Sequence, residues 1–187
     1  IRSLYFDDPF DTALWEKSSG VGSRDKFRIR IYNMQDDAIK LERKHKEGQY
    51  IKKDSVSLSR RDCDEIVRGR FECLKHNDSP FAMQFYGIFV ANHLRPKVLV
   101  DYTREPYVFP AEDVRITFDK NIRSAMRNTD LFNPNVITYP IWELRNCMIL
   151  EVKFNESLPQ YVQELLTLGA AERTAASTYV FCRQYEF

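Results

Sequence analysis

Glycine, cysteine and histidine are scarce in this chain of 187 residues, which has six glycines, four cysteines and three histidines. No glycine-rich phosphate loop is present, which excludes that way of binding a nucleotide. The histidines show neither the spacing of metal ligands nor a local catalytic signature with serine or cysteine; they are His45, His76 and His93. The cysteines are widely spaced, as is typical of free thiols in a reducing compartment; they are Cys63, Cys73, Cys147 and Cys182.

Long apolar runs and an excess of either charge are also missing. No run approaches the length of a membrane span and no signal peptide is visible, so we expect a cytoplasmic protein. Lys and Arg total 28, and Asp and Glu total 27, a balance that argues against a nucleic-acid binder. With 43% hydrophobic residues, the chain should form a single globular domain over residues 1–187. Any anion site must therefore come from separation of charge within the fold.

Alternation of apolar and polar residues predicts an antiparallel β-sheet in an α+β fold. In residues 26–33, Phe27, Ile29 and Ile31 share one face, while Arg28 and Arg30 share the other. Short turns join the following segments into a meander. We expect strands at residues 1–7, 26–33, 38–46, 50–59, 96–109, 114–120 and 147–154. We expect helices at residues 9–17 with Asp8 as the N-cap, and at residues 60–74, 80–94, 158–168 and 170–182.

The polar faces of these strands are unusually basic. A solvated face normally mixes both signs of charge with Ser, Thr and Gln, whereas the cations at alternate positions or strand ends here are Arg28, Arg30, Lys44, Arg104 and Arg115. If the sheet closes into a barrel with this face inward, the cations repel one another and lose hydration. A phosphate polyanion would relieve both costs, and the helices would cover the apolar faces outside.

Two carboxylates lie among these cations, and each has two readings. Glu42 and Glu151 could pair with neighbouring lysines, or a carboxylate beside bound phosphate could hold Mg²⁺ or Mn²⁺. The ion pair is favoured for Glu42, and both readings stay open for Glu151. The face of Lys52 is also ambiguous, because it shares a side with Val56 and Leu58 unless a bulge intervenes.

Six segments, taken in order, resemble the VTC domain, a polyphosphate polymerase branch of the triphosphate tunnel metalloenzymes. Each segment alone is a weak signal, and their order along most of the chain makes the resemblance fairly specific. They are Ile1-Arg2-Ser3-Leu4-Tyr5-Phe6-Asp7, Phe27-Arg28-Ile29-Arg30-Ile31-Tyr32, Glu42-Arg43-Lys44, Tyr102-Thr103-Arg104, Val114-Arg115-Ile116-Thr117-Phe118-Asp119 and Leu150-Glu151-Val152-Lys153.

The resemblance implies a tunnel of eight antiparallel strands in which the γ-phosphoryl group of ATP is transferred to a growing inorganic polyphosphate chain. It implies that the residues binding the triphosphate and carrying catalysis are Arg28, Arg30, Lys44, Arg104 and Arg115. Lys52 and Lys153 join them as substrate-binding residues. Glu151 matches the family's ligand for Mn²⁺ or Mg²⁺. The implied partners are ATP, polyphosphate and a membrane-associated protein, with no nucleic acid and no membrane segment in this chain.

The chain departs from the family pattern at two places. The family's first strand, which carries another basic residue, would precede Ile1, so we expect an N-terminally shortened domain. Near the other end, Ser177-Thr178-Tyr179 stands where the family has Ser-Lys-Tyr. Both departures favour weaker activity. Two alternatives to the polymerase stay open: a tripolyphosphate or polyphosphate hydrolase on the same fold, which the motifs do not separate from it, and a non-catalytic polyphosphate-binding module, which the two departures favour.

Overall fold

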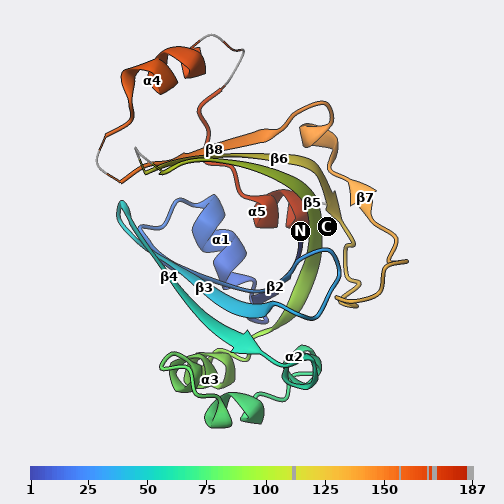
Figure 1. The fold of residues 1–187 in the computed structure, drawn as a ribbon. Coiled ribbons are helices and arrows are strands. Elements are labelled where there is room, and N and C mark those ends of the chain that lie inside the picture. The colour runs from blue at the N-terminus through green and yellow to red at the C-terminus, as the bar shows by residue number, and fades with distance from the viewer. Residues whose placement is uncertain (111–112, 156, 168, 170–171, 185–187) are drawn as a thin grey trace.

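An eight-stranded antiparallel sheet forms the body of the molecule (Figure 1). The computed structural model describes residues 1–110, 113–155, 157–167, 169 and 172–184. The strand order is β4-β3-β2-β1-β5-β6-β7, and β8 pairs with β6. The strands are β1 (Arg2–Asp7), β2 (Ser23–Ile31), β3 (Ile39–Glu47), β4 (Tyr50–Leu58), β5 (Arg95–Phe109), β6 (Val114–Ser124), β7 (Tyr139–Pro140) and β8 (Ile149–Lys153).

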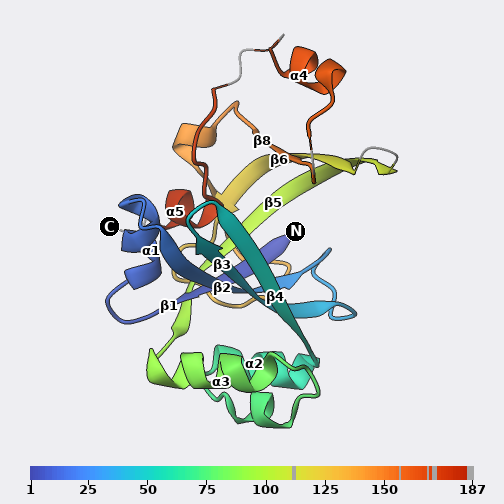
Figure 2. The same ribbon diagram turned by 90° about the vertical axis from the view of Figure 1, so that its left-hand side faces the viewer.

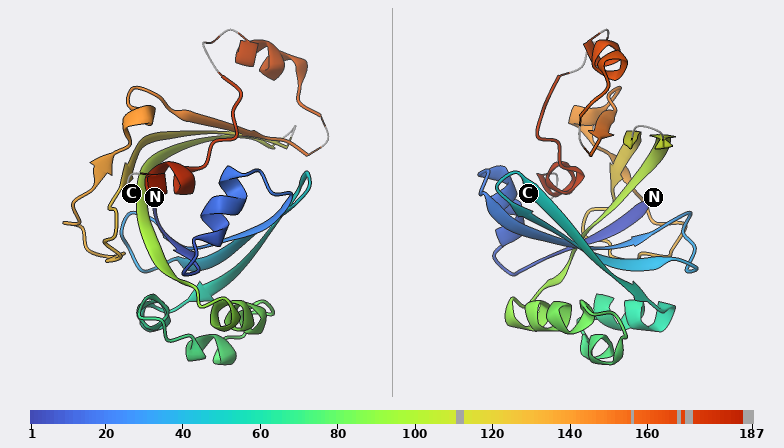
Figure 3. Two further views of the ribbon diagram at one scale, coloured as in Figure 1. Left: turned by 180° about the vertical axis from the view of Figure 1, so that it is seen from behind. Right: turned by 60° about the vertical axis from the view of Figure 1, so that its left-hand side comes forward.

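The sheet is strongly curved, and its helices lie on both sides (Figures 1 and 2). On the convex side of β2 to β4 lie α2 (Arg60–Val67), η1 (Glu72–His76) and α3 (Ala82–Ala91). On the concave side lie α1 (Thr12–Ser18) and α5 (Thr178–Arg183), as the view from behind also shows (Figure 3). The other helical segments are η3 (Trp142–Leu144) and α4 (Gln160–Thr167). Every helix in the described part of the chain is too short or too polar to cross a bilayer.

The apolar strand faces of the β1–β4 half point outward, onto α2, η1 and α3. Leu4, Ile29 and Leu41 are fully buried in this core. Phe27 packs edge-on against Phe89 of α3, with ring centroids 5.2 Å apart. Because successive side chains of a strand alternate between faces, this packing leaves the charged faces of the same strands on the concave side.

The α+β fold with an antiparallel sheet is confirmed, but the sheet is not closed. Among the described residues, β4 pairs only with β3, and β8 pairs only with β6. The long strand β5 joins the two halves of the sheet, because its first part pairs with β1 and its second part with β6. Val100 and Asp101 pair with both neighbours, and a shift of register in the β5–β6 pair follows between Asp101 and Thr103. The result is an open, curved sheet, whose concave side is called the trough below, and not a sealed barrel.

Three predicted helices differ from the observed ones. The helix predicted from residue 60 to 74 is divided at Gly69, whose φ of 81° ends α2 before η1 begins. The first helix begins at Thr12 and not at residue 9, and Asp8 accepts hydrogen bonds from the amides of Phe10 and Thr12.

The helix predicted over residues 170–182 is mostly absent. Residues 172–177 have no regular structure, and residues 170–171 lie outside the described part of the chain. Tertiary contacts override helix propensity here, because Lys17 of α1 donates to the carbonyl of Ala175 and Lys26 of β2 donates to the hydroxyl of Ser177. Residue 168, the predicted end of the preceding helix, also lies outside the described residues.

Candidate polyanion site

The register of β1 to β4 places basic side chains in rows across the concave face. Residues directly opposite one another in an antiparallel pair point to the same side of the sheet. Arg28 lies opposite Tyr5 on one side and Glu42 on the other. One step along, Lys26 lies opposite Lys44, which in turn lies opposite Lys53 on β4.

Glu42 is the buried anion at the centre of this face, with 2% of its surface exposed. Its carboxylate accepts from Nε of Arg28 at 2.8 Å, lies 3.8 Å from Nε of Arg30 and contacts Nζ of Lys53. Burial alone would raise the pKa of Glu42, but Arg28, Arg30 and the bond from Lys53 lower it to about 2. Its ion pairs therefore stabilise the fold at neutral pH, and this contribution is lost as the pH falls from about 4.5 to 2.

Lys26, Lys44 and Lys53 form a row of like charges, the lysine row, which contains no carboxylate of its own. Like charges directly opposite one another destabilise a sheet. Burial, with the nearby charges of Lys44 and Arg28, lowers the pKa of Lys26 to about 8, although Tyr5 acts against the shift. Burial likewise lowers the pKa of Lys44, opposed by Glu151 and reinforced by Lys153 and Arg28. A bound polyanion would reverse both effects by favouring the charged forms.

A second group of charges faces this one from β5, β6 and β8. Arg104 forms a bidentate ion pair with Asp119, with two N–O distances of 2.6 Å. Glu151 lies opposite Thr117, and Lys153 lies opposite Arg115. Glu151 and Lys153 both influence the pKa of Lys44 on β3, so the two halves of the trough are in electrostatic contact across it.

Several buried polar atoms on this face lack hydrogen-bond partners among the described residues. They are Oγ of Ser3, Nε of Arg30 and Oγ1 of Thr117. Ser3 and Arg30 lie directly opposite one another on β1 and β2. Unsatisfied buried donors are rare in folded proteins and require an explanation such as a missing ligand or water. Together with the lysine row, they indicate a site for an anion.

The carboxylates fit a metal ion only if phosphate supplies further ligands. No group of three or more His, Cys, Asp or Glu side chains that could hold a metal occurs in the described part of the chain. Glu151 is held loosely, 3.5 Å from Nζ of Lys153 and 3.9 Å from Arg104, and its side chain is 36% exposed. One oxygen ligand from Glu151, completed by phosphate and water, suits Mg²⁺ or Mn²⁺. The donor set does not suit a metal centre made of protein ligands alone.

The structure brings most of the predicted site residues to one face. Those on the concave face are Arg28, Arg30, Lys44, Arg104, Arg115, Glu151 and Lys153. Lys52 is not among them. It lies opposite His45 on the convex face, where its Nζ is 3.5 Å from Asp54 and 5.7 Å from the ring centre of Phe81. The β3–β4 register runs without a bulge from Ile39 to Glu47, so Lys53 takes the concave position.

Sequence reasoning missed four concave-face residues. Lys26 and Lys53 extend the same alternation that identified Arg28 and Lys44, so strand parity alone could have found them. Tyr5 and Tyr102 carry no such signal, because aromatic residues in a strand most often pack in the core. Their hydroxyl groups accept hydrogen bonds from Arg28 and Arg30.

The neighbouring pair Lys52 and Lys53 allows a direct test of the assigned face. We expect Lys53→Met to weaken tripolyphosphate binding about fivefold, the equivalent of about 1 kcal/mol for one partly solvated contact. Lys52→Met makes the same change of charge one residue away on the convex face and should leave affinity unchanged. Calorimetric titration of both variants decides: equal losses, or a loss for Lys52→Met alone, would contradict the assignment.

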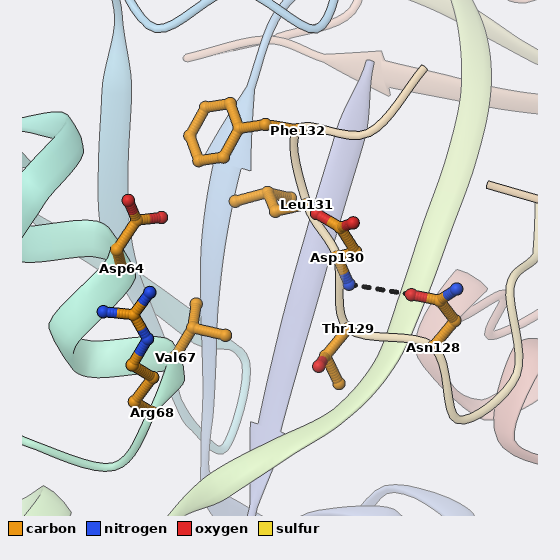
Figure 4. A pocket seen from close by; sticks show the side chains of 8 residues that line it. All are labelled: Asp64, Val67, Arg68, Asn128, Thr129, Asp130, Leu131 and Phe132. Carbon is orange, nitrogen blue, oxygen red and sulfur yellow. Dashed lines mark hydrogen bonds between the residues drawn. The ribbon is translucent and has the colours of Figure 1, made fainter. Parts of the chain in front are cut away.

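A separate pocket of about 270 Å³ lies on the convex side, between α2 and the loop at residues 128–132 (Figure 4). Its lining mixes signs of charge, with Asp64 of α2 and Arg68, which caps the C-terminus of α2, facing Asp130. The amide of Asp130 donates to the side chain of Asn128 at 2.9 Å, which orders the loop itself. None of the basic concave-face residues lines this pocket, so it has no part in the polyanion site.

Comparisons with known proteins identify the family and support the fold. The family model described as the VTC domain matches residues 1–187, the whole chain. Among solved structures, a crystal structure from Bacillus halodurans with the provisional name adenylate cyclase has a similar fold, with a TM-score of 0.53 and 13% sequence identity. The match covers 94% of this chain and 77% of that one. At this identity the likeness shows the fold alone. A search among curated proteins gave no match.

Proposed function

The chain belongs to the VTC domain family, and we propose that it is a polyphosphate polymerase that uses ATP. In this reaction the terminal oxygen of a polyphosphate chain attacks the γ-phosphorus of ATP. The bond from that phosphorus to the bridging oxygen breaks, and ADP leaves. The chain becomes one phosphate longer.

The observation that carries the proposal is the convergence of cations on the concave face with unsatisfied buried donors among them. Arg28, Arg30 and Arg104 supply planar guanidinium groups, which hold phosphate oxygens in pairs. Lys26, Lys44 and Lys53 supply point charges in a row across three strands. Phosphoryl transfer depends on positioning and on stabilising charge, and it needs no protein nucleophile. A basic trough with no catalytic triad therefore suits this chemistry.

The residues would divide the work by position. Arg28 and Arg30 would bind the reacting phosphates near the buried centre, and Arg104 would do so from the opposite wall. Lys44, Lys153 and Arg115 would hold other parts of the polyanion. A Mn²⁺ or Mg²⁺ ion held by Glu151 and phosphate oxygens would neutralise charge that develops on the transferring group. Until phosphate binds, Glu42 and Asp119 keep the arginines paired.

The deciding experiment is incubation of the protein with ATP and Mn²⁺, followed by gel electrophoresis for long polyphosphate chains. Long chains and ADP are expected. Release of orthophosphate from tripolyphosphate without chain growth would instead identify a hydrolase. Tight tripolyphosphate binding without either product would identify a non-catalytic binding module. Thr178, which stands at the family's lysine position, favours this binding module as the second candidate function. A partner associated with a membrane is part of the proposal and is tested separately, by co-purification.

A further inference from the structure

Two buried tyrosines on the concave face are bonded to the two central arginines. Nη1 of Arg28 donates to the hydroxyl of Tyr5 at 3.0 Å, and Nη2 of Arg30 donates to the hydroxyl of Tyr102 at 3.3 Å. Each tyrosine is 5% exposed. A phenylalanine would fill the same space, so the hydroxyl groups need a separate explanation.

Arg28 is held from two sides in the plane of its guanidinium group. Nε donates to Glu42 at 2.8 Å and Nη1 donates to Tyr5. Nη2 has no hydrogen-bond partner among the described residues. Because a guanidinium group is rigid and planar, two bonds in its plane fix the direction of the third nitrogen. The remaining nitrogen is therefore oriented before any ligand arrives.

Tyr5 is itself fixed from the side of α5. Its ring centre lies 5.1 Å from that of Tyr179, and its hydroxyl lies 3.3 Å from Oγ1 of Thr178. Tyr179 is anchored in turn, because its hydroxyl donates to Asp7 at 2.5 Å. The orientation of Arg28 thus depends on the docking of α5 through Tyr5.

We propose that Tyr5 is a positioning residue for phosphate binding, which holds Arg28 in the orientation that a phosphate group requires, and that Tyr102 acts in the same way on Arg30. This inference rests on the proposed function of the trough as a polyphosphate site. It assigns a role to residues that touch the binding cations and do not themselves contact phosphate. Preorganised donors bind more tightly because less side-chain entropy is lost when the ligand arrives.

The pH dependence of binding gives a signature that packing alone would not produce. Burial raises the pKa of Tyr5, but Arg28, Lys26 and the bond with Thr178 outweigh it and lower the pKa to about 8. The other groups that influence this hydroxyl are Lys44 on β3 and Tyr102 on β5. Above about pH 8 the tyrosinate pairs with Arg28 and repels phosphate, so affinity should fall. Lys26 loses charge over the same range, since its pKa is also about 8.

The test is metal-free calorimetric titration with tripolyphosphate, combined with thermal melts. At pH 7, Tyr5→Phe should bind about three- to tenfold more weakly, because Arg28 loses its orientation but keeps its own contact with phosphate. Tyr86→Phe is the matched control, because it removes a partly buried tyrosine hydroxyl from α3 on the convex side and should leave affinity unchanged. Between pH 7 and 9.5, the affinity of the wild type should fall more than that of Tyr5→Phe, so the ratio of the variant's affinity to that of the wild type should rise. The loss of charge from Lys26 occurs in both proteins and does not change this expectation.

A double-mutant cycle shows whether Tyr5 acts through Arg28. In an Arg28→Met background, Tyr5→Phe should have no further effect on affinity. An equal effect in both backgrounds, or a gain of affinity in the single variant, would overturn the inference while leaving the polyphosphate site in place. If the wild type does not bind tripolyphosphate, the proposed function fails first, and the inference fails with it.

Discussion

Arg30→Met should weaken tripolyphosphate binding about 30- to 100-fold, the equivalent of about 2 to 3 kcal/mol for one charge-assisted hydrogen bond. Arg30 is 6% exposed, and its Nε has no hydrogen-bond partner in the described part of the chain. It lies 3.8 Å from Glu42, which keeps closer contacts with Arg28 and Lys53. Much of the binding capacity of Arg30 is therefore unused in the unliganded fold and is available to phosphate.

The same variant should change the free energy of unfolding by no more than about 1 kcal/mol. Methionine fills most of the volume that arginine occupies, and one cation fewer reduces repulsion within the cluster. Calorimetric titration and a thermal melt measure the two effects separately. Lys52→Met is the control for removing a positive charge from the same sheet on its convex face. Unchanged affinity in Arg30→Met would count against any phosphate role for the central arginines.

Alternation along the strands could be predicted from the sequence because it is a local property. Arg28 and Arg30 lie on the concave face because Phe27, Ile29 and Ile31 are needed on the other face, in the core under α3. The same logic already pointed to the convex face for Lys52. The family resemblance suggested the concave face, and the continuous β3–β4 register shows that parity was the better guide.

Closure of the sheet and the position of α5 could not be predicted from local patterns. Closure depends on how far β4 and β8 curve toward each other, which is set by the twist of the whole sheet. The helix predicted over residues 170–182 had adequate propensity, but Lys17 and Lys26 bind its first part in a non-helical form. Contacts between residues about 150 positions apart leave no periodic signal in the sequence.

The role of the acidic residues also needed three dimensions. Glu42 was expected to pair with a lysine, and it does contact Lys53 on β4, but it also accepts a hydrogen bond from Arg28 on β2. Asp119 was noticed only as part of a motif, and the structure shows that it occupies the guanidinium group of Arg104. A polyanion must therefore replace these internal carboxylates. Glu151 differs from Glu42 and Asp119 in this respect, because it is loosely held and is not tightly paired with an arginine.

Glu151→Gln should reduce Mn²⁺-dependent turnover at least about 100-fold, because it removes a loosely held carboxylate that can share a cation with phosphate. Metal-free tripolyphosphate binding should stay the same or become tighter, since the change removes a negative charge from the trough. Glu105→Gln is the matched control. Glu105 lies on the other face of β5, paired with Lys120 at 2.7 Å, and its neutral variant should behave like the wild type in both assays.

The two readouts separate a metal ligand from a simple ion-pair partner. If Glu151 only neutralises Lys153, which lies 3.5 Å away, the variant frees that lysine for phosphate and tightens binding, but the Mn²⁺ dependence of turnover is unchanged. If Glu151 holds the metal, the Mn²⁺ concentration for half-maximal turnover rises steeply or turnover disappears, while metal-free binding persists. Normal Mn²⁺-dependent turnover in Glu151→Gln would leave the metal without a protein ligand on this wall, because Asp119 is already engaged by Arg104.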